Sequence, residues 1–338
     1  MIHRKIAGIE RPVSALCLGT AQYGSQMDEA ASFALLDRFA ERGGTFLDSA
    51  HIYGAWAPAG ANGGCGNSEV VIGRWMRARR CRRGMVVATK GGHPDFRTGA
   101  SRLTREGVTR HLQESLVHLD TDYIDLYWLH RDDRAIPVAE ILGWIEGPFR
   151  QGLIRAVGCS HWRTDRLREA MQCAAATGLP HIIGSQIAWS LAQAGVSRVD
   201  GPFGEQLAMD AETWAFHRDS GLAVAAYNAQ AGGFFAARYD DLDFASPDFP
   251  KPGLWKKYGG ATNLRRRRAA RALARRNGCS ANQVAVAYLL HQPFPTYALV
   301  GPRTLEQLDD SMGAADVALS AAEAAGLAAD SDRDGAPR

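Results

Sequence analysis

Four ionisable side chains in this chain have types and spacing suited to proton transfer. Asp48 and Tyr53 stand in TFLDSAHIYG (residues 45–54), directly after a short apolar segment. Lys90 ends the segment VVATK, and His130 ends the segment DLYWLH. A buried carboxylate is costly unless a cation pairs with it, so Asp48 requires a cationic partner such as Lys90.

Together these side chains predict a site that gives a proton to a carbonyl oxygen. Tyrosine, at its ordinary pKa of ~10, is a weak acid near neutral pH. A neighbouring lysine cation lowers that pKa, and a carboxylate paired with the lysine makes its burial tolerable. A histidine can hydrogen-bond the carbonyl and orient it. Each residue alone has an ordinary structural interpretation, but four at successive strand ends favour one common site.

The elements that must position these residues follow a repeating pattern. Short apolar segments alternate with amphipathic segments of helical periodicity, and Asn67 is expected to cap the helix over residues 68–79. Eight strands alternating with helices predict an α/β fold, a closed (β/α)8 or TIM barrel, whose active site lies at the carboxyl ends of the strands. The predicted strands are residues 15–18, 45–47, 85–89, 123–129, 156–159, 182–185, 222–226 and 296–300.

Several segments lie outside this alternation. Residues 2–16 predict an N-terminal β-hairpin that covers the bottom of the barrel. Residues 228–260 predict a long loop after the seventh strand, and loops of this length are usually functional. The glycine-rich residues 60–66 are interpreted as a flexible rim, because no strand leads into them. We expect one barrel domain over residues 1–325 and a disordered tail over residues 326–338.

The composition is typical of a globular protein without a strongly charged surface. The 338 residues are 46% hydrophobic and 22% charged, with a net charge of +3, which does not favour a nucleic-acid or membrane partner. No apolar run is long enough to cross a bilayer. The six cysteines form no CxxC pair, so we expect reduced thiols, a cytoplasmic location and no metal site. The arginine run 265–268 is interpreted as a solvated helix face.

Nine segments in order make the chain resemble the aldo-keto reductase family. They are GTAQYG, FLDSAHIYG, NSEVVIG, ATKGG, YIDLYWLHR, GLIRAVGCSHW, the Gln186 segment, AVAAYNAQAGGFF and LVGPRTLEQLDDS. The resemblance implies a barrel that reduces carbonyl compounds with NADPH and binds this cofactor extended across the barrel mouth. It also implies that no Rossmann domain is needed, and the chain has no GxGxxG between a strand and a helix.

The resemblance implies a role for each matching residue. Tyr53 would be the general acid, tuned by Lys90 and Asp48, and His130 would orient the carbonyl. The nicotinamide end would be bound by Ser160, His161, Gln186 and Tyr227, the last by stacking on the ring. The other expected cofactor-binding residues are Gly19, Thr20, Asn228, Gly232, Gly301, Arg303 and Gln307. Arg303 is the expected partner of the 2′-phosphate, because a guanidinium pairs bidentately with phosphate oxygens.

Three positions depart from the family pattern near the expected cofactor. His161 and Ser311 each stand where the family usually has Asn. The tripeptide Asn-Ala-Gln at residues 228–230 replaces the usual Ser-Pro-Leu. These departures leave the four proton-transfer residues unchanged, but they change contacts expected for the nicotinamide, the adenine and the phosphates.

The substrate is less well defined by the sequence. Trp56 and Trp162 are candidate pocket residues together with His130 and the polar residues HRDD at 130–133. Aromatic faces beside polar groups suit a sugar-like polyol, so a keto-sugar, a polyhydroxylated ketone and a simple aldehyde all stay open.

Two other classes of protein stay open. One is a cofactor-binding regulatory subunit with slow turnover, a kind of protein that the family also contains. The other is an aldolase that forms a Schiff base at Lys90. Asp48 argues against the aldolase, because a paired ammonium stays protonated whereas an amine nucleophile must be neutral. The sequence leaves open whether the protein is a monomer or a homo-oligomer.

Overall fold

Eight parallel strands close into a barrel in the computed structural model, which describes residues 1–57, 64–239, 246 and 250–329. The strands follow the order β11–β12–β3–β4–β5–β6–β7–β8 around the barrel. Each one overlaps a predicted strand, so the predicted TIM barrel is confirmed. Their bounds are β3 (Leu16–Gly19), β4 (Phe46–Asp48), β5 (Val86–Gly91), β6 (Leu126–Leu129), β7 (Val157–Ser160), β8 (Ile182–Ala188), β11 (Ala223–Tyr227) and β12 (Thr296–Val300).

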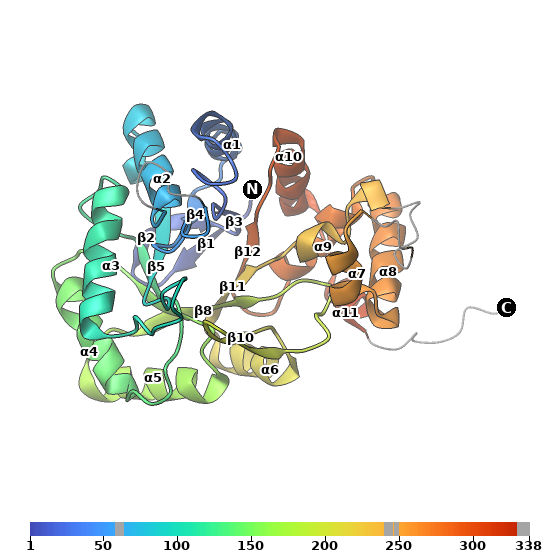
Figure 1. The fold of residues 1–338 in the computed structure, drawn as a ribbon. Helices are drawn as coiled ribbons and strands as arrows, with labels where there is room; N and C mark the ends of the chain where they lie inside the picture. Colours follow the sequence, from blue (N-terminus) through green and yellow to red (C-terminus); the bar gives the residue numbers. More distant parts are fainter. Residues whose placement is uncertain (58–63, 240–245, 247–249, 330–338) are drawn as a thin grey trace.

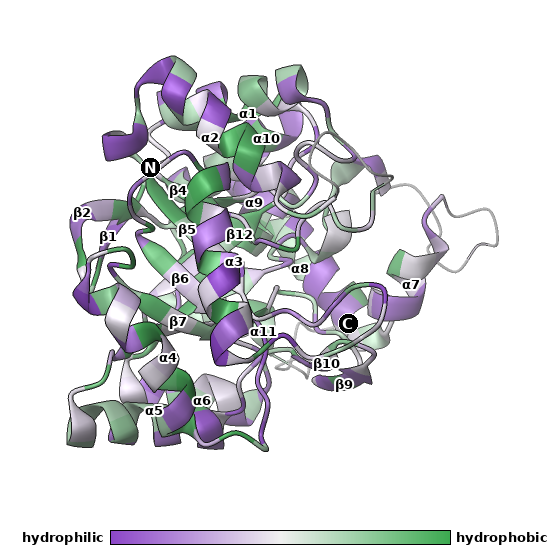
Figure 2. Ribbon diagram, turned by 60° about the vertical axis from the view of Figure 1, so that its left-hand side comes forward, coloured by the Kyte–Doolittle hydropathy of each residue, from purple (hydrophilic) through white to green (hydrophobic). Residues whose placement is uncertain are grey.

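Helices surround this barrel and cover its strands (Figure 1). Figure 2 shows that the strands are mostly hydrophobic, whereas most helices also carry hydrophilic residues, as expected for helices with one buried face. The longer helices are α1 (Glu29–Glu41), α2 (Asn67–Arg79), α3 (Arg105–His118), α4 (Val138–Arg150), α5 (Thr164–Thr177), α6 (Ala211–Ser220), α8 (Ala261–Asn277), α9 (Ala281–Leu290), α10 (Leu305–Gly313) and α11 (Ala321–Ala328). The expected cap of α2 is wrong by one residue: Gly66, with a φ of 75°, is the N-cap, and Asn67 begins the helix.

The N-terminal hairpin, β1 (His3–Ile6) and β2 (Ile9–Ser14), closes one end of the barrel. Ile6, Ile9 and Val13 join a buried cluster with Phe46 and Trp128 of the barrel strands. Large apolar side chains therefore fill the barrel at its amino-terminal end. The predicted hairpin is confirmed, and the polar strand ends are left at the opposite, carboxyl-terminal end.

A second hairpin lies between β8 and α6 and was not predicted. It consists of β9 (Arg198–Gly201) and β10 (Gly204–Leu207), which pair antiparallel. Their sequences, RVDG and GEQL, lack the alternation of apolar and polar residues that indicates a strand. The hairpin matters for the site, because its turn lies over the mouth of the barrel.

Other expectations need correction. The long stretch after β11 contains the helix α7 (Pro252–Tyr258), although residues 240–245 and 247–249 lie outside the described residues. Helix α11 extends through residues 326–328, which were expected to belong to the tail; residues 330–338 lie outside the described residues, as do residues 60–63 of the expected glycine-rich rim. Arg266 and Arg267 are buried and donate to backbone carbonyls of other segments, so the arginine run is not simply a solvated face.

Candidate active site

The carboxyl ends of β4 and β5 bring Asp48, Lys90 and Tyr53 together. The two strands are neighbours in the barrel, Asp48 ends β4, and Lys90 lies one residue before the end of β5. Lys90 Nζ lies 2.5 Å from Asp48 Oδ2 and 2.5 Å from the carbonyl oxygen of Ser49. It also donates to the hydroxyl of Tyr53 over 3.2 Å. One ammonium therefore connects the carboxylate to the phenol.

Burial and neighbouring charges shift the pKa values of both Lys90 and Tyr53. Burial lowers the pKa of Lys90, but the Asp48 charge and Tyr53 raise it, and the resulting pKa lies above the ordinary value. Burial raises the pKa of Tyr53; the Lys90 cation opposes this effect without reversing it, since Asp48 also raises the pKa. Lys90 therefore lowers the pKa of Tyr53, as expected, but burial raises this pKa by more. The phenolate loses more stabilisation from water than it gains from a cation that is also paired with a carboxylate.

His130 follows β6 and faces the same cavity as Tyr53. The two ring centroids are 6.3 Å apart, and the ring planes are nearly perpendicular, at 79°. Burial lowers the pKa of His130 well below its ordinary value, and the Arg131 and Lys90 cations contribute in the same direction. The imidazole is therefore neutral at neutral pH, and a neutral imidazole has one N–H to donate and one nitrogen to accept.

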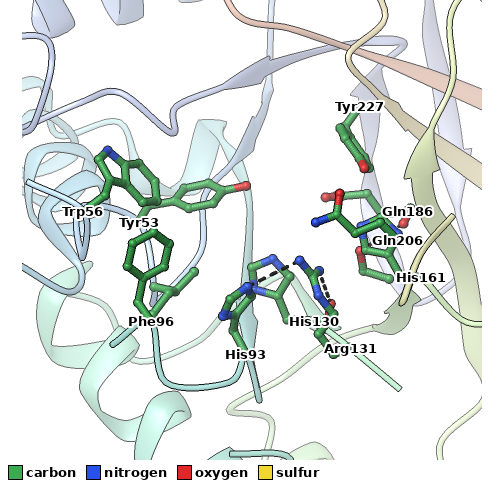
Figure 3. A pocket seen from close by; sticks show the side chains of 12 residues that line it. Tyr53, Trp56, His93, Phe96, His130, Arg131, His161, Gln186, Gln206 and Tyr227 are labelled. Carbon is green, nitrogen blue, oxygen red and sulfur yellow. Dashed lines mark hydrogen bonds between the residues drawn. The ribbon is translucent and has the colours of Figure 1, made fainter. Parts of the chain in front are cut away.

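This cavity has a volume of about 260 Å³ and opens over Tyr53 and His130. Figure 3 shows Tyr53, Trp56 and Phe96 on one side, His93, His130 and Arg131 in the middle, and His161, Gln186, Gln206 and Tyr227 on the other side. The structure therefore places Trp56 in the cavity wall, as expected. Trp162 does not line it: this side chain is buried, and its Nε1 donates to the backbone oxygen of Arg131. The substrate role expected for Trp162 is not supported by this position.

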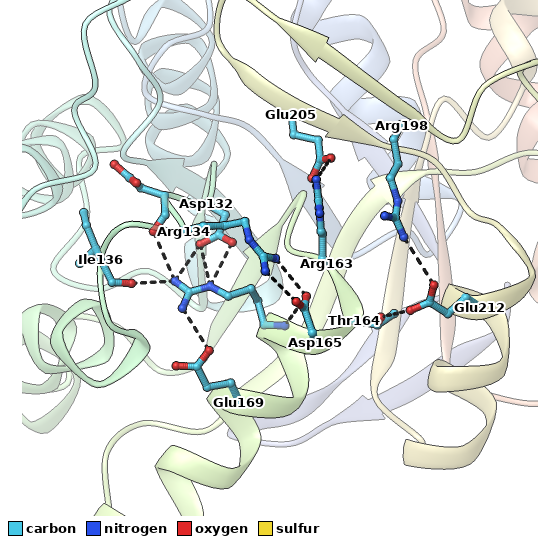
Figure 4. A network of polar contacts seen from close by, with 12 residues as sticks. Asp132, Arg134, Ile136, Arg163, Thr164, Asp165, Glu169, Arg198, Glu205 and Glu212 are labelled. Atoms are coloured by element: carbon cyan, nitrogen blue, oxygen red, sulfur yellow. Dashed lines mark hydrogen bonds and ion pairs between the residues drawn. The ribbon is translucent and has the colours of Figure 1, made fainter.

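His93 is a cavity residue that the sequence did not indicate, whereas Arg131 belongs to the HRDD segment that was expected to line a pocket. The HRDD segment gave a signal for a polar pocket, but the structure separates its members. Arg131 lines the cavity, whereas Asp132 turns away to pair with Arg166, whose Nη2 lies 3.1 Å from Asp132 Oδ1. Figure 4 shows this outer network of Asp132, Asp165 and neighbouring charges, which ties the loop after β6 to α5.

Ser160, His161 and Gln186 lie together across the cavity. The Gln186 side chain donates to Asp48 Oδ1 over 2.9 Å, and Ser160 Oγ donates to the Gln186 carbonyl oxygen over 2.9 Å. His161 has a φ of 59°, in the left-handed region, which Asn and His both enter more readily than most residues. Its Nδ1 accepts from the Leu207 N–H over 2.8 Å, and burial lowers its pKa to about 3, so the neutral ring keeps its proton on Nε2.

A groove of about 490 Å³ continues from this cavity across the barrel mouth. Tyr53 and Tyr227 line both spaces, so the groove begins beside Tyr53. Seven expected cofactor-binding residues line the groove: Gly19, Thr20, Asn228, Gly232, Gly301, Arg303 and Gln307. Ser160, His161 and Gln186 lie instead in the cavity, and Tyr227 lies between. The structure therefore brings all of the expected cofactor-binding residues to one continuous surface.

The groove has the chemistry that an extended dinucleotide requires. A side chain at Gly301 would meet no protein atom within 4 Å, so this backbone leaves open space beside the groove. Among the described residues, three cationic side chains line the groove, Arg238, Lys251 and Arg303, of which the sequence indicated only Arg303. Cations and exposed backbone near glycines are suited to phosphate oxygens. The residues present thus fit a nicotinamide dinucleotide.

Two of the departures from the family pattern contact each other. The Gln230 side chain donates to Ser311 Oγ over 2.9 Å and accepts from the Gly301 N–H over 3.2 Å. Ser311 in turn donates to the carbonyl oxygen of Gln307 over 2.6 Å. A longer side chain at position 230 therefore reaches the shorter one at position 311, and the two hold the segment after β12 against the segment after β11.

The β9–β10 hairpin completes the cavity wall. Arg163 Nε lies 2.7 Å from Glu205 Oε2, which fastens β10 to the start of α5 (Figure 4). The turn places the ring of Phe203 with its centroid 5.0 Å from that of Phe96, in a stacked arrangement. Phe203 also contacts His93, with centroids 5.4 Å apart. Phe203 thus packs behind two residues of the cavity wall, whereas Gln206 of β10 lines the cavity itself.

The chain belongs to the Aldo/keto reductase family of oxidoreductases, since the model of this family matches residues 15–329. It is 31% identical to the uncharacterized oxidoreductase YrpG of Bacillus subtilis, over 91% of this chain and 89% of the relative. It is 28% identical to the norsolorinic acid reductase stcV of Emericella nidulans, over 93% of this chain and 77% of the relative. It is also 28% identical to the aldo-keto reductase yakc [NADP(+)] of Schizosaccharomyces pombe, over 90% of this chain and 83% of the relative.

In the described ranges, no group of three or more His, Cys, Asp or Glu side chains is arranged to hold a metal ion. Of the helices in that same part of the chain, none has both the length and the apolar character that crossing a membrane requires.

Proposed function

We propose that the protein is an NADPH-dependent carbonyl reductase that converts an aldehyde or ketone to an alcohol, reversibly. One observation carries this proposal above the others. The Lys90 ammonium contacts both Asp48 and Tyr53 at the point where a dinucleotide-sized groove meets a small cavity. A proton donor between a cofactor groove and a substrate cavity is the arrangement that carbonyl reduction needs.

The chain's own residues then have defined tasks. The nicotinamide cofactor, when bound, supplies the hydride for the carbonyl carbon. Tyr53 donates its hydroxyl proton to the carbonyl oxygen, and Lys90 stabilises the phenolate that results. Asp48 and the Ser49 carbonyl hold the ammonium in place. His130, which is neutral, donates a hydrogen bond to the carbonyl oxygen and orients it. In the reverse direction the Tyr53 phenolate accepts the alcohol proton.

Binding of the cofactor is assigned to the groove and the far wall of the cavity. Ser160, His161 and Gln186 hold the carboxamide, Tyr227 stacks on the nicotinamide ring, and the glycines Gly19, Gly232 and Gly301 leave room for the phosphates. Arg303 binds the 2′-phosphate and selects NADPH. The name of the fission yeast relative, which includes NADP(+), agrees with this choice.

The raised pKa of Lys90 disfavours the aldolase alternative, because a Schiff-base lysine must lose its proton first. The regulatory-subunit alternative differs from a reductase only in turnover. The deciding experiment is multiple-turnover oxidation of NADPH, followed by absorbance, with a panel of aldehydes, ketones and keto-sugars. Sustained oxidation with at least one member supports the reductase. Stoichiometric cofactor binding without turnover on any member of the panel would support a regulatory subunit.

A further inference from the structure

Arg131 is a buried cation in the wall of the substrate cavity. Its side chain lines the cavity, and the residue is only 8% exposed. Within the described residues, no carboxylate lies within ion-pair distance of its guanidinium. Burying a charge without an opposite charge is costly, so a counter-charge from outside the chain would be favourable.

Neutral groups hold the guanidinium in place. Its Nε donates to the Phe203 carbonyl oxygen over 3.0 Å, and its Nη1 donates to the His130 carbonyl oxygen over 2.8 Å. Its Nη2 lies 3.3 Å from His93 Nε2. Since His93 Nδ1 lies 2.8 Å from the carbonyl oxygen of Pro94, the His93 proton is on Nδ1, and Nε2 accepts. A guanidinium carries five N–H groups, so Nη1 and Nη2 keep two of them for a ligand.

The rest of the cavity adds no negative charge. None of the described residues that line it is an aspartate or a glutamate. His130 and His161 are neutral, as argued above, and burial lowers the pKa of His93 to about 4, so this ring is neutral too. Asp48 lies beneath the cavity, but Lys90 compensates it. Arg131 is therefore the uncompensated charge that a molecule in this cavity would meet.

The position of Arg131 relates it to the reacting carbonyl. His93 lies between Arg131 and His130, the residue that orients the carbonyl. The His93 ring centroid is 4.8 Å from that of His130, and His93 Nε2 contacts the Arg131 guanidinium. Trp56 and Phe96 form an aromatic wall beside this path, with centroids 6.1 Å apart. A ligand that places its carbonyl at Tyr53 and His130 can thus place a ring against the wall and an anion at Arg131.

We propose that Arg131 binds a carboxylate of the substrate, so that this site takes carbonyl compounds that also carry a carboxylate a few bonds away. This inference rests on the proposed reductase function, because it names the substrate class of the same cavity. Two parallel hydrogen bonds between a guanidinium and a carboxylate give both affinity and orientation. The carboxylate would also supply the counter-charge that the buried guanidinium lacks.

The test compares acids with esters of the same shape. The probes are 3- and 4-carboxybenzaldehyde and their methyl esters, which sample two separations between carbonyl and carboxylate. The measured quantity is the ratio of kcat/KM for each acid to kcat/KM for its ester, which cancels any general loss of activity. We expect the ratio to favour an acid in the unmodified protein and to fall about 10- to 100-fold in Arg131→Met. Arg131→Lys, which keeps the charge but not the bidentate geometry, should lie between.

The matched control is Arg134→Met. Arg134 lies in the same loop, but it is exposed and pairs with Asp165, with Nη2 2.8 Å from Oδ2. Its removal should leave the ratio unchanged. A ratio that favours the ester for both isomers, or that stays the same in Arg131→Met, would overturn the proposal. If Arg131→Met does not fold, the unmodified protein and Arg131→Lys still decide it.

A binding measurement separates this inference from the proposed function. Calorimetric titration of each aldehyde into the protein with NADP+ requires no turnover, because the oxidised cofactor cannot reduce an aldehyde. Tighter binding of an acid that depends on Arg131, combined with no oxidation of NADPH by any probe in the kinetic assay, would support the anion site and contradict the reductase. Reduction of both esters and acids without preference would support the reductase and contradict the anion site.

Discussion

Lys90 Nζ lies 2.5 Å from Asp48 Oδ2, and both residues are only 1% exposed. The pair is therefore a fully buried ion pair rather than a surface contact. Asp48 has a second partner, since its Oδ1 accepts from the Gln186 side chain over 2.9 Å. Both partners of the carboxylate are donors, so an amide at position 48 can satisfy only one of them.

Asp48→Asn should therefore destabilise the protein. Removing one member of a buried ion pair typically costs about 3–5 kcal/mol, because the other charge is left uncompensated. We expect a loss of this size in the free energy of unfolding, measured with urea at neutral pH, together with slower reduction. Asp309→Asn is the control, because Asp309 forms only partly exposed pairs, with Arg42 and Arg38, and should change stability by less than about 1 kcal/mol. Equal losses in the two variants would contradict the special cost of the buried pair.

Tyr53→Phe should abolish general acid catalysis without removing the cofactor site. The expected loss in the rate of reduction is about 10²–10⁴-fold, whereas the dissociation constant of NADPH should stay unchanged. Tyr127→Phe is a suitable control: this buried phenol donates to the Val108 carbonyl oxygen and lies outside the cavity. Single-turnover kinetics with pre-bound NADPH isolate the step. Near-normal rates in Tyr53→Phe would remove Tyr53 from the role of acid.

The pH profile follows from the direction of the Tyr53 pKa. Because burial raises this pKa and Lys90 does not reverse the shift, the phenol keeps its proton throughout the neutral range. A general acid works below its pKa, so the single-turnover rate should not fall as the pH rises from ~6 to ~9. In Lys90→Met the opposing cation is lost, the pKa rises further, and the step should be slower at every pH. A decline centred below pH ~9 in the unmodified protein would refute the raised pKa.

Arg303→Ala should weaken the preference for NADPH over NADH. A charge-assisted hydrogen bond to the 2′-phosphate contributes about 1.5–3 kcal/mol, so NADPH affinity should fall about 10- to 100-fold, with little change for NADH. Because Arg303 is exposed, the lower end of this range is expected. Lys251→Ala serves as a comparison, since Lys251 lies beside Gly232 and should affect both cofactors alike. An unchanged preference in Arg303→Ala would exclude Arg303 as the selecting residue.

His118 and Glu69 form a second polar pair whose effect depends on pH. His118 Nδ1 lies 3.0 Å from Glu69 Oε2, and the hydrogen bond to Glu69 raises the pKa of His118 despite partial burial. A raised folded-state pKa means that the stabilisation is complete below the unfolded pKa of ~6.5 and is lost as the pH rises through the folded value.

The measurement is the difference in unfolding free energy between the unmodified protein and His118→Gln across pH. We expect this difference to be largest in mild acid and to shrink toward alkaline pH. Taking the difference cancels the contribution of the neighbouring His111 ring, whose pKa is lowered mainly by burial and not by His118. The pKa of His51 is also lowered mainly by burial, but His118 lowers it too, so the difference includes this coupling between the two rings. A difference that grows with pH would contradict the assignment.

The sequence by itself determined the barrel and the meeting of Asp48, Tyr53 and Lys90 at its mouth, because both depend on local patterns. Alternating apolar and amphipathic segments specify parallel strands, and consecutive strands become neighbours in a closed barrel. The polar residue that ends each strand therefore reaches the same mouth, which is why the sequence alone predicts that Asp48 and Lys90 meet. The N-terminal hairpin followed from the same kind of local pattern.

Contacts between distant segments decided the rest. Arg131 and Asp132 are adjacent in the chain, but only the position of Arg166 on α5 turns Asp132 away and leaves Arg131 in the cavity wall. Trp56 and Trp162 look alike in sequence, and only their burial in the folded chain distinguishes them. Trp56 is exposed at the rim of the cavity, whereas Trp162 is buried in the core. The short polar strands of the β9–β10 hairpin carry no local sequence signal. A contact between distant residues, the Arg163–Glu205 ion pair, holds the hairpin over the site. The direction of the Tyr53 pKa depends on how much water the folded chain excludes, and that exclusion exists only once the whole barrel is assembled.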